Sequence, residues 1–402
     1  MQKKLWVWLS LLFGANSYIY KKLLTHFGSI ERIYDSDDAD VNLIDWLSPS
    51  DKYKLLDKSL KNAENILETC QYIDANILTP SDSEYPQSLM EIDRIPAVLY
   101  YKGRLPDFNK NLFVSVVGTR KFTQDGKRNA YTLGYGLAKG GAIVVSGMAL
   151  GVDSTAQKGA LYAGGTSVAV LGCGIDVVYP RENYKLMQKL ISVGTVITEY
   201  PPNTPPNGFQ FPQRNRIISA LSRAVVVVEC PSNSGALITA KMAMEQGKDL
   251  FAFPGSVNSY VSDGNNQLLR EGARMATSAI DVLEQYMDEY AFINLSASKE
   301  RPVLPKSNSN AETFNANNDR KNKDTKQEEM IKKQEGSNEE FDTSQLNPVE
   351  KKIYDFMQFE AIISLDDLVE LDLSIAEIAS SLTMLEIKGA IESVPGGYYR
   401  KK

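Results

Sequence analysis

The sequence predicts a doubly wound α/β fold built on a parallel β-sheet, and two observations support this prediction. Short apolar runs alternate with helical stretches between residue 77 and about residue 290. Almost every position in each run is apolar, which is typical of a parallel strand covered on both faces. Regular alternation of such strands with helices favours a doubly wound sheet. The runs are LFVSVVG, AIVVSG, TSVAVLG, TVITE, AVVVVE and DLFAFPG.

The chain of 402 residues is long enough for two or three domains. Residues 1–75 have the pattern of short helices and predict a small helical domain before the α/β domain of residues 76–292. Residues 293–345 are rich in Asn, Lys, Glu and Ser, which predicts a flexible linker. Residues 346–402 predict a winged-helix domain, because a PGG hairpin follows three helix candidates. The candidates span about residues 348–359, 365–371 and 374–388.

The N-terminus has two interpretations. Lys3 and Lys4 precede the apolar run LWVWLSLLFGA, which has the length of a secretory signal. A helical rhythm continues through Ile19, Leu23 and Phe27, which favours the first helices of a soluble domain instead. No other run approaches the roughly 20 apolar residues of a membrane span.

Composition limits the kinds of site that the chain can carry. Its net charge is −6, so nucleic-acid binding would need a local basic patch. Three cysteines without CxxC spacing fit a reducing, cytoplasmic environment and exclude a disulfide scaffold or a cysteine-based zinc site. His26 is the only histidine, which almost excludes histidine-based triads and metal sites. We therefore expect no metal or cofactor.

Small residues follow several of the predicted strands. Ligands of open α/β sheets lie beyond the carboxyl ends of the strands, so these turns predict an anion-binding rim, although sharp turns alone also require glycine. The first turn, GTR, matches neither GxGxxG nor a Walker A loop, but Arg120 could hold a phosphate there unless it is an ordinary surface arginine. The turns are GTR (118–120), SGMALG (146–151), LGCGID (171–176), SGALITA (234–240) and FPG (253–255).

The stretch FPQRNRIISALS begins at residue 211 and predicts a helix, because Pro212 suits a first helical turn. Arg214 and Arg216 are two positions apart, so they point to roughly opposite sides of that helix. One arginine could face the rim, and the other could pair with Glu199 or Glu229 at a neighbouring strand end. The sequence does not decide which.

Phe211 is expected in the loop before this helix and has two interpretations. Its ring could stack on a base beside a basic groove, as in proteins that hold single strands without reading their sequence. It could instead be a hydrophobic staple against the helix. Phe209 is an alternative or additional stacking residue.

Three acidic residues lie near strand ends, but no pair of a nucleophile and a base can be assembled from them. Asp153, Asp176 and Glu199 are therefore expected to cap helices or form ion pairs. Cys173 and Cys230 are expected to be core thiols.

The last predicted helix of the C-terminal domain is not basic. It carries Glu377 and Glu386 against Lys388, which favours a protein contact over the DNA major groove.

With these motifs in order, the chain resembles the DNA processing protein A family (DprA, also called Smf) from about residue 78 to residue 290. The flanks resemble it more loosely: residues 14–34 look like its SAM-like N-terminal domain and residues 365–400 like its winged helix. The motifs are EYPQSLMEIDRIPAVLYYKG, VVGTR, VVSGMALGVDSTAQKGAL, VAVLGCGIDVVYP, ITEYPP, FPQRNRIISALS, VVVEC, SGALITAKMAMEQGKDLFAFPG and GNNQLLREGA.

The resemblance implies an extended Rossmann-like protein that binds single-stranded DNA without known catalysis. Such proteins protect incoming strands, load the RecA-type recombinase during natural transformation, and dimerise through the Rossmann-like domain. The implied DNA-binding residues are Arg120, Arg181, Phe211, Arg214, Asn215 and Arg216, with Gly118, Ser146, Gly147, Gly172 and Gly174 shaping the rim.

Some residues depart from the family pattern, and two other functions stay open. Gln157 stands where many members have histidine, and Ser234-Gly235-Ala236 where Ser-Gly-Ser is common. The broader superfamily includes nucleotide phosphoribohydrolases, but their PGGxGTxxE motif is absent here. A protein-binding scaffold in competence regulation is the third interpretation.

Overall fold

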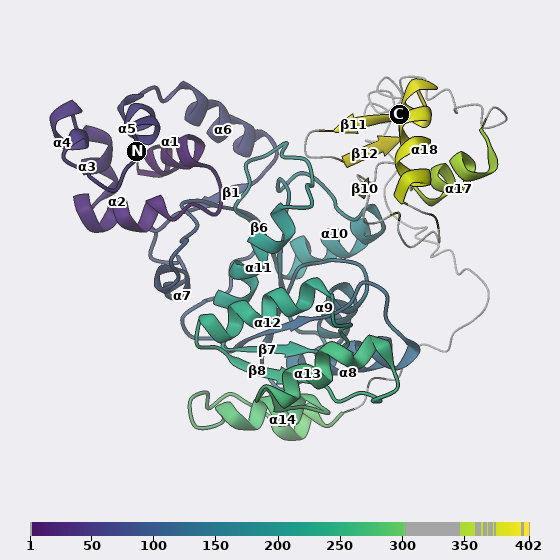
Figure 1. The fold of residues 1–402 in the computed structure, drawn as a ribbon. Coiled ribbons are helices and arrows are strands. Elements are labelled where there is room, and N and C mark those ends of the chain that lie inside the picture. Colours follow the sequence, from purple (N-terminus) through teal and green to yellow (C-terminus); the bar gives the residue numbers. More distant parts are fainter. Residues whose placement is uncertain are drawn as a thin grey trace, which may run out of the picture. The chain divides into compact units, whose positions relative to one another are not determined.

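The computed structural model describes residues 2–300, 302, 346–357, 363–364, 368, 373, 375–394 and 398–401. The chain divides into two compact units, Met1–Lys306 and Ser307–Lys402. The larger unit contains a nine-stranded sheet with helices around it (Figure 1). The boundary predicted between residues 75 and 76 lies inside this unit and stays a prediction.

The sheet has the strand order β1-β2-β6-β5-β4-β3-β7-β8-β9. β2 is antiparallel to both β1 and β6, and all other neighbouring pairs are parallel. The strands are β1 (Asn76–Leu78), β2 (Leu99–Gly103), β3 (Phe113–Val117), β4 (Ile143–Ser146), β5 (Ser167–Val170), β6 (Thr195–Thr198), β7 (Ala224–Val227), β8 (Asp249–Ala252) and β9 (Arg274–Met275).

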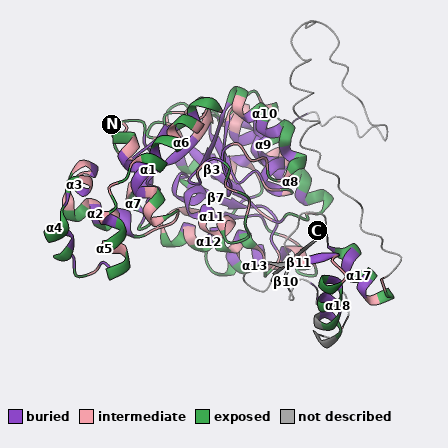
Figure 2. Ribbon diagram, turned by 90° about the horizontal axis from the view of Figure 1, so that it is seen from above, coloured by how far each residue is buried: buried purple, intermediate pink, exposed green. Residues whose placement is uncertain are grey.

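The six predicted parallel strands are confirmed as β3 to β8. Nearly all their residues are buried, as expected for strands covered on both faces, and Figure 2 shows β3 and β7 as buried ribbons. Alternate residues of β3 belong to different cores: Val114 and Val116 pack with α8 and α9, whereas Phe113 and Val117 lie in the core that contains α11 and α12. These helix pairs therefore cover opposite faces of the sheet.

The helices of this unit follow the strands in the order that the sequence predicts. α8 and α9 follow β3 and β4, and α11 and α12 flank β7 in the chain. The helices are α1 (Gln2–Phe13), α2 (Ile19–Phe27), α3 (Ile30–Asp35), α4 (Asp38–Asn42), α5 (Pro49–Leu56), α6 (Lys61–Tyr72), α7 (Gln87–Glu91), α8 (Gln124–Lys139), α9 (Val152–Tyr162), α10 (Tyr184–Val193), α11 (Gln210–Ala220), α12 (Gly235–Glu245), α13 (Asp263–Arg270), α14 (Ala279–Leu283) and α15 (Leu295–Ser298).

The signal-like N-terminal run forms α1 and is packed in the interior. Trp6 and Trp8 are buried, and their indole N–H groups donate to Ser81 Oγ and to the Asp57 carbonyl oxygen. The helices α1 to α6 share one hydrophobic core with one face of the sheet. This packing fits the interpretation of the run as the first helix of a folded domain.

The smaller unit contains α17 (Pro348–Phe356), α18 (Ile375–Ile387) and a three-stranded sheet in the order β10-β12-β11. β11 (Ile391–Val394) and β12 (Tyr398–Lys401) pair antiparallel, as expected on either side of the predicted hairpin, whose PGG turn lies outside the described residues. β10 (Ile363–Ser364) adds a third strand. Apart from Leu368, the helix candidate at 365–371 lies outside the described residues, as does most of the predicted linker. Residues 295–298 of that linker form α15, which packs on α8.

Candidate nucleic-acid interface

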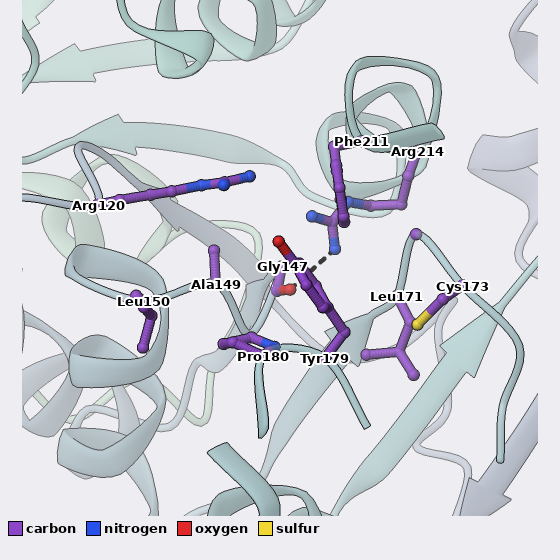
Figure 3. Close-up of a pocket in the computed structure, with 11 residues that line it drawn as sticks. Arg120, Gly147, Ala149, Leu150, Leu171, Cys173, Tyr179, Pro180, Phe211 and Arg214 are labelled. Atoms are coloured by element: carbon purple, nitrogen blue, oxygen red, sulfur yellow. Dashed lines mark hydrogen bonds between the residues drawn. The ribbon is translucent and has the colours of Figure 1, made fainter. Parts of the chain in front are cut away.

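A pocket lies at the carboxyl ends of the central parallel strands. β3 lies between β4 and β7, so the chain changes its winding direction there, which is where open α/β sheets bind ligands. The turns after β3, β4 and β5 and the start of α11 supply the walls (Figure 3). The lining residues are Arg120, Gly147, Ala149, Leu150, Leu171, Gly172, Cys173, Tyr179, Pro180, Phe211 and Arg214.

Arg214 is the arginine of α11 that reaches the pocket. Its side chain is almost fully buried, and Nη1 donates to the carbonyl oxygens of Gly147, at 2.9 Å, and Val170. Asn215 does not line the pocket, but its Oδ1 accepts from Arg214 Nε at 3.2 Å and so orients the guanidinium. Burial lowers the pKa of Arg214 to about 10, which leaves it protonated at neutral pH. The pocket therefore has a fixed positive charge in its wall.

Asp153 lies behind the same turn and holds it from the other side. One carboxylate oxygen accepts from the Gly147 N–H at 3.0 Å. Burial raises the pKa of Asp153, and the nearby Arg214 opposes that rise. A Cβ on Gly147 would lie 2.5 Å from Arg214 Nη2 and 2.7 Å from the Asp153 carboxylate, so only glycine fits between the two charges.

An aromatic pair and an exposed arginine form the mouth of the pocket. The Phe211 ring stacks on Tyr179 with centroids 5.3 Å apart and an interplanar angle of 26°. The Arg120 guanidinium lies over the Phe211 ring at 5.4 Å from its centroid. A Cβ on Gly172 would lie 2.8 Å from Phe211, so glycine there makes room for the ring. The predicted residues Arg120 and Phe211 thus come together with Gly172.

The predicted position of Phe211 in a loop is wrong. α11 begins at Gln210 with Phe209 at its N-cap, so Phe211 already lies in the first turn with Pro212. A staple residue must precede the N-cap, so the staple interpretation does not apply to Phe211. Its ring packs on Tyr179 and Gly172 at the pocket.

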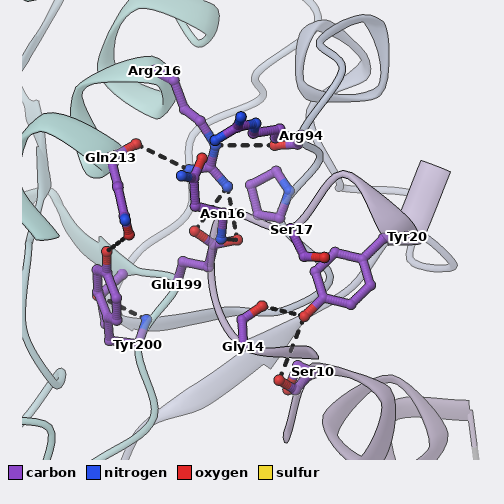
Figure 4. A network of polar contacts seen from close by, with 12 residues as sticks. Ser10, Gly14, Asn16, Ser17, Tyr20, Arg94, Glu199, Tyr200, Gln213 and Arg216 are labelled. Carbon is purple, nitrogen blue, oxygen red and sulfur yellow. Dashed lines mark hydrogen bonds and ion pairs between the residues drawn. The ribbon is translucent and has the colours of Figure 1, made fainter. Parts of the chain in front are cut away.

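Arg216 points away from the pocket and braces α11. Its Nη2 donates to both carboxylate oxygens of Glu199 at 2.8 Å, and both side chains are almost fully buried (Figure 4). Glu199 also accepts from the backbone N–H of Asn16 at 3.1 Å, and Arg216 Nε donates to the Arg94 carbonyl oxygen. The two arginines point to different sides of α11 as expected, and Glu199 is the ion-pair partner, while contact of either arginine with DNA stays a prediction. Glu229 instead caps the start of α8, accepting from Thr123.

The remaining predicted site residues lie near the pocket without lining it. Arg181 follows Pro180 directly, in the short 3-10 helix Arg181–Asn183, and its side chain is exposed. Ser146 is fully buried, and its hydroxyl donates to the Val116 carbonyl oxygen, so its side chain joins strands. Gly118 packs against Val152, and the Gly174 N–H donates to the Thr204 carbonyl oxygen. Their contribution to binding stays a prediction.

Of the three acids expected to cap helices or form ion pairs, Glu199 forms an ion pair, whereas Asp153 and Asp176 accept from backbone N–H groups of turns. Asp176 accepts from the Asn203 N–H at 2.9 Å, and Asp153 and Glu199 are bonded as described above. Cys173 and Cys230 are buried, and burial raises the pKa of Cys173 to about 12. Among the described residues, no group of His, Cys, Asp or Glu side chains could hold a metal ion.

Gln157, the departure from the family pattern, lies in the core rather than at the pocket. It is fully buried on α9, and its amide donates to Ser167 Oγ and to the Val168 carbonyl oxygen. Gln157 therefore joins α9 to β5 and does not line the pocket.

Sequence reasoning missed Tyr179 and Leu150, which line the pocket beside the predicted residues. Tyr179 belongs to a long turn after β5, where no periodic pattern marks the direction of a side chain. Its only signal is its place directly before Pro180 and Arg181.

Two family models match this chain. The one described as DNA recombination-mediator protein A matches residues 76–287, and the DprA winged helix domain matches residues 338–397. Protein Smf from Synechocystis is 33% identical over 407 residues, covering 99% of this chain and 98% of that relative. This chain belongs to the DNA recombination-mediator protein A family. The predicted resemblance and the C-terminal winged helix are confirmed.

A solved structure of this family agrees with the fold. DNA processing protein A from Streptococcus pneumoniae matches with a TM-score of 0.60 and 34% identity, covering 67% of this chain and 93% of that chain. A structure of the Helicobacter pylori protein, described as showing its single-stranded DNA binding mode, matches with a TM-score of 0.49 and 31% identity, covering 54% of this chain and 97% of that chain. None of the described helices is long and apolar enough to cross a membrane.

Proposed function

We propose that this protein binds single-stranded DNA in the pocket between Arg120, Arg214 and Phe211 and acts as a recombination mediator. The observation that carries the proposal is the combination of two arginines with a stacked aromatic pair in one pocket. Arginines attract the phosphates, and aromatic rings offer a surface for unpaired bases. The same ligand is named for another DNA processing protein A, from Helicobacter pylori.

The aromatic pair of the pocket favours an unpaired strand over a duplex. In a duplex, each base is stacked between its neighbours and cannot present a face to the Phe211 ring. An unpaired base can leave its stack and pack on this aromatic pair when the Arg120 guanidinium moves from the Phe211 ring to the phosphate. The proposed recognition therefore depends on unstacked bases.

We propose binding without catalysis. The residues that line the pocket include no carboxylate and no histidine. Asp153 is buried behind Gly147, and its carboxylate already accepts a hydrogen bond from the Gly147 N–H. This supports a binding site over the nucleotide-processing enzyme that the sequence left open.

We further propose a homodimer through the sheet domain and a partnership with the RecA-type recombinase, as the family resemblance implies. Large exposed apolar side chains on the segment from β8 to β9 support a protein contact there. They are Val257, Tyr260 and Met275, exposed by 83%, 59% and 63%. Light scattering on the purified protein should give twice the chain mass, and a monomer at all concentrations would contradict the dimer.

The central test compares single-stranded and duplex oligonucleotides of one sequence by fluorescence anisotropy. We expect tighter binding to the single strand and a steep loss with salt, because phosphate contacts release counterions. Arg120→Ala should weaken binding to all sequences and reduce the slope of log K against log salt by about 0.7 for each lost phosphate contact.

Arg32→Ala is the matched control, because Arg32 is an exposed arginine on α3 in the N-terminal helices. It should leave both affinity and salt slope unchanged. Equal affinity for blunt duplex would contradict single-strand recognition. If Arg120→Ala binds with the affinity and salt slope of the wild type, Arg120 does not belong to the binding site.

A further inference from the structure

Two helices that start beside the pocket repeat the same pair of residue types. On α8, Lys127 and Tyr131 are four positions apart, and on α9 so are Lys158 and Tyr162. Residues four apart on a helix lie on one face, so each helix carries a lysine next to a tyrosine on that face. We call these four residues the α8–α9 strip.

The contacts between α8 and α9 bring the two pairs together. The rings of Tyr131 and Tyr162 are 6.1 Å apart, centroid to centroid. The helices touch through glycine, because a Cβ on Gly159 would lie 2.2 Å from the Tyr131 carbonyl oxygen. Lys127 and Lys158 each lie one helical turn before the tyrosine of their own helix. The strip is thus one continuous surface.

The strip is open to solvent and locally positive. Tyr162 is 59% exposed, Tyr131 is half-buried and both lysines are exposed. Residues 119–164 contain six basic and two acidic side chains, a net charge of +4 in a chain whose net charge is −6, and one of the six, Lys139, pairs with Glu300 outside this stretch. Of the two acids, Asp125 pairs with Arg128 and Asp153 is buried. An anionic ligand with aromatic groups fits this surface.

The strip continues directly from the pocket. Arg120 and Leu150 line the pocket, and each belongs to the turn that leads into α8 or α9. Lys127 lies in the first turn of α8, and Lys158 lies six residues into α9, about 9 Å along the helix axis from Val152. The turn that carries Arg120 therefore leads into the helix whose first turn carries Lys127.

We propose that a single strand leaving the pocket continues over the α8–α9 strip, with its phosphates on Lys127 and Lys158 and its bases against Tyr131 and Tyr162. The inference rests on the proposed binding of single-stranded DNA and extends it to a second subsite. The strip adds length to the binding site and does not read sequence, because lysine meets phosphate and every base has a face for stacking.

The test measures the affinity of the full-length protein for two oligothymidylates, one of about 5 nucleotides and one of about 20, chosen around the known range of single-strand site sizes. For the Lys127→Ala/Lys158→Ala variant, we expect about a tenfold loss with the long strand and no loss with the short one. Its salt slope for the long strand should fall by about 1.4, or 0.7 for each phosphate contact. Tyr162→Ala should weaken the long strand alone, by about fivefold or more.

Two comparisons separate the strip from the pocket. Arg120→Ala should lower the affinity for both strands, because Arg120 acts in the pocket. Lys110→Ala should leave the affinity for both strands unchanged, because this exposed lysine precedes β3 at the opposite end of the sheet. If the strip variants bind the long strand as tightly as the wild type does, or lose the same affinity for both strands, the proposed second subsite is wrong. Either result leaves the proposed binding in the pocket unaffected. Failure of the wild-type protein to bind either strand would overturn the strip and the proposed function together.

Discussion

Two arginines of the same helix have opposite roles, and the residues around them decide which role each takes. Arg214 lies at the ends of β4 and β5, where it donates hydrogen bonds to two backbone carbonyl oxygens beside the pocket. Arg216 meets the carboxylate of Glu199 on the other side of α11. Helical geometry predicts that the two point apart, but the absolute rotation of the helix depends on tertiary packing. The sequence therefore shows the division of roles and not its direction.

Phe211 and Phe209 offer a direct test of base stacking, because they are two residues apart at the same helix end. Phe211→Ala should weaken single-strand binding by about 1–3 kcal/mol, since a base loses its stacking surface. Phe209→Ala should have little effect, because Phe209 is 61% exposed and does not line the pocket. Anisotropy titrations of both variants measure the difference.

Thermal unfolding of both phenylalanine variants serves as the control. If Phe211→Ala lowers the melting temperature but binds single strands normally, the Phe211 ring stabilises the fold and does not stack on a base. If Phe209→Ala loses the greater affinity, the stacking residue is Phe209.

At the scale of elements, α11 is held in place by the buried ion pair between Glu199 and Arg216. Glu199→Gln keeps the shape of the side chain and removes its charge, which leaves Arg216 buried without a counter-charge. We expect a loss of about 3 kcal/mol in the free energy of unfolding, measured by urea denaturation. Single-strand affinity should also fall, because α11 carries Arg214 and Phe211.

Glu289→Gln is the matched control for this charge removal. Glu289 pairs with Arg223 at 3.0 Å, and both side chains are about half exposed. Surface pairs of this kind contribute at most about 1 kcal/mol, so this variant should unfold almost as the wild type does. Equal losses in the two variants would show that the Glu199 pair does not stabilise α11.

The elements that the sequence predicts correctly share a strong local signal. β3 to β8 are continuous runs of apolar, mostly β-branched residues, which few other structures accommodate. β1, β2 and β9 have weaker local signals, because β1 and β9 have only three and two residues and β2 ends in Lys102 and Gly103. Likewise, Arg120 could be predicted from its place after β3, whereas Tyr179 comes from a turn whose path depends on the whole fold.

At the scale of the whole molecule, the two compact units allow a test of where DNA binds. A chain that ends at Lys306 keeps the pocket and the complete sheet and lacks the winged-helix domain. We expect it to bind single strands with unchanged affinity, because the described part of α18 carries Glu377 and Glu386 and is not a basic recognition helix. The same anisotropy titration measures this.

A large loss of affinity in the shortened chain would show that the winged-helix domain holds DNA. Circular dichroism of the shortened chain is the control, since its helical and strand signals must persist for the comparison to be valid. Retained affinity together with loss of recombinase binding would assign the domain to a protein contact.

The turn at Gly147 has a consequence for how fast DNA can be captured. Its N–H is bound by the Asp153 carboxylate and its carbonyl oxygen by the Arg214 guanidinium, so both ends of one residue are already fixed. A wall that is ordered before the ligand arrives loses little conformational entropy on binding. Association should then be limited by diffusional encounter with a positively charged surface, with no slow rearrangement of this turn.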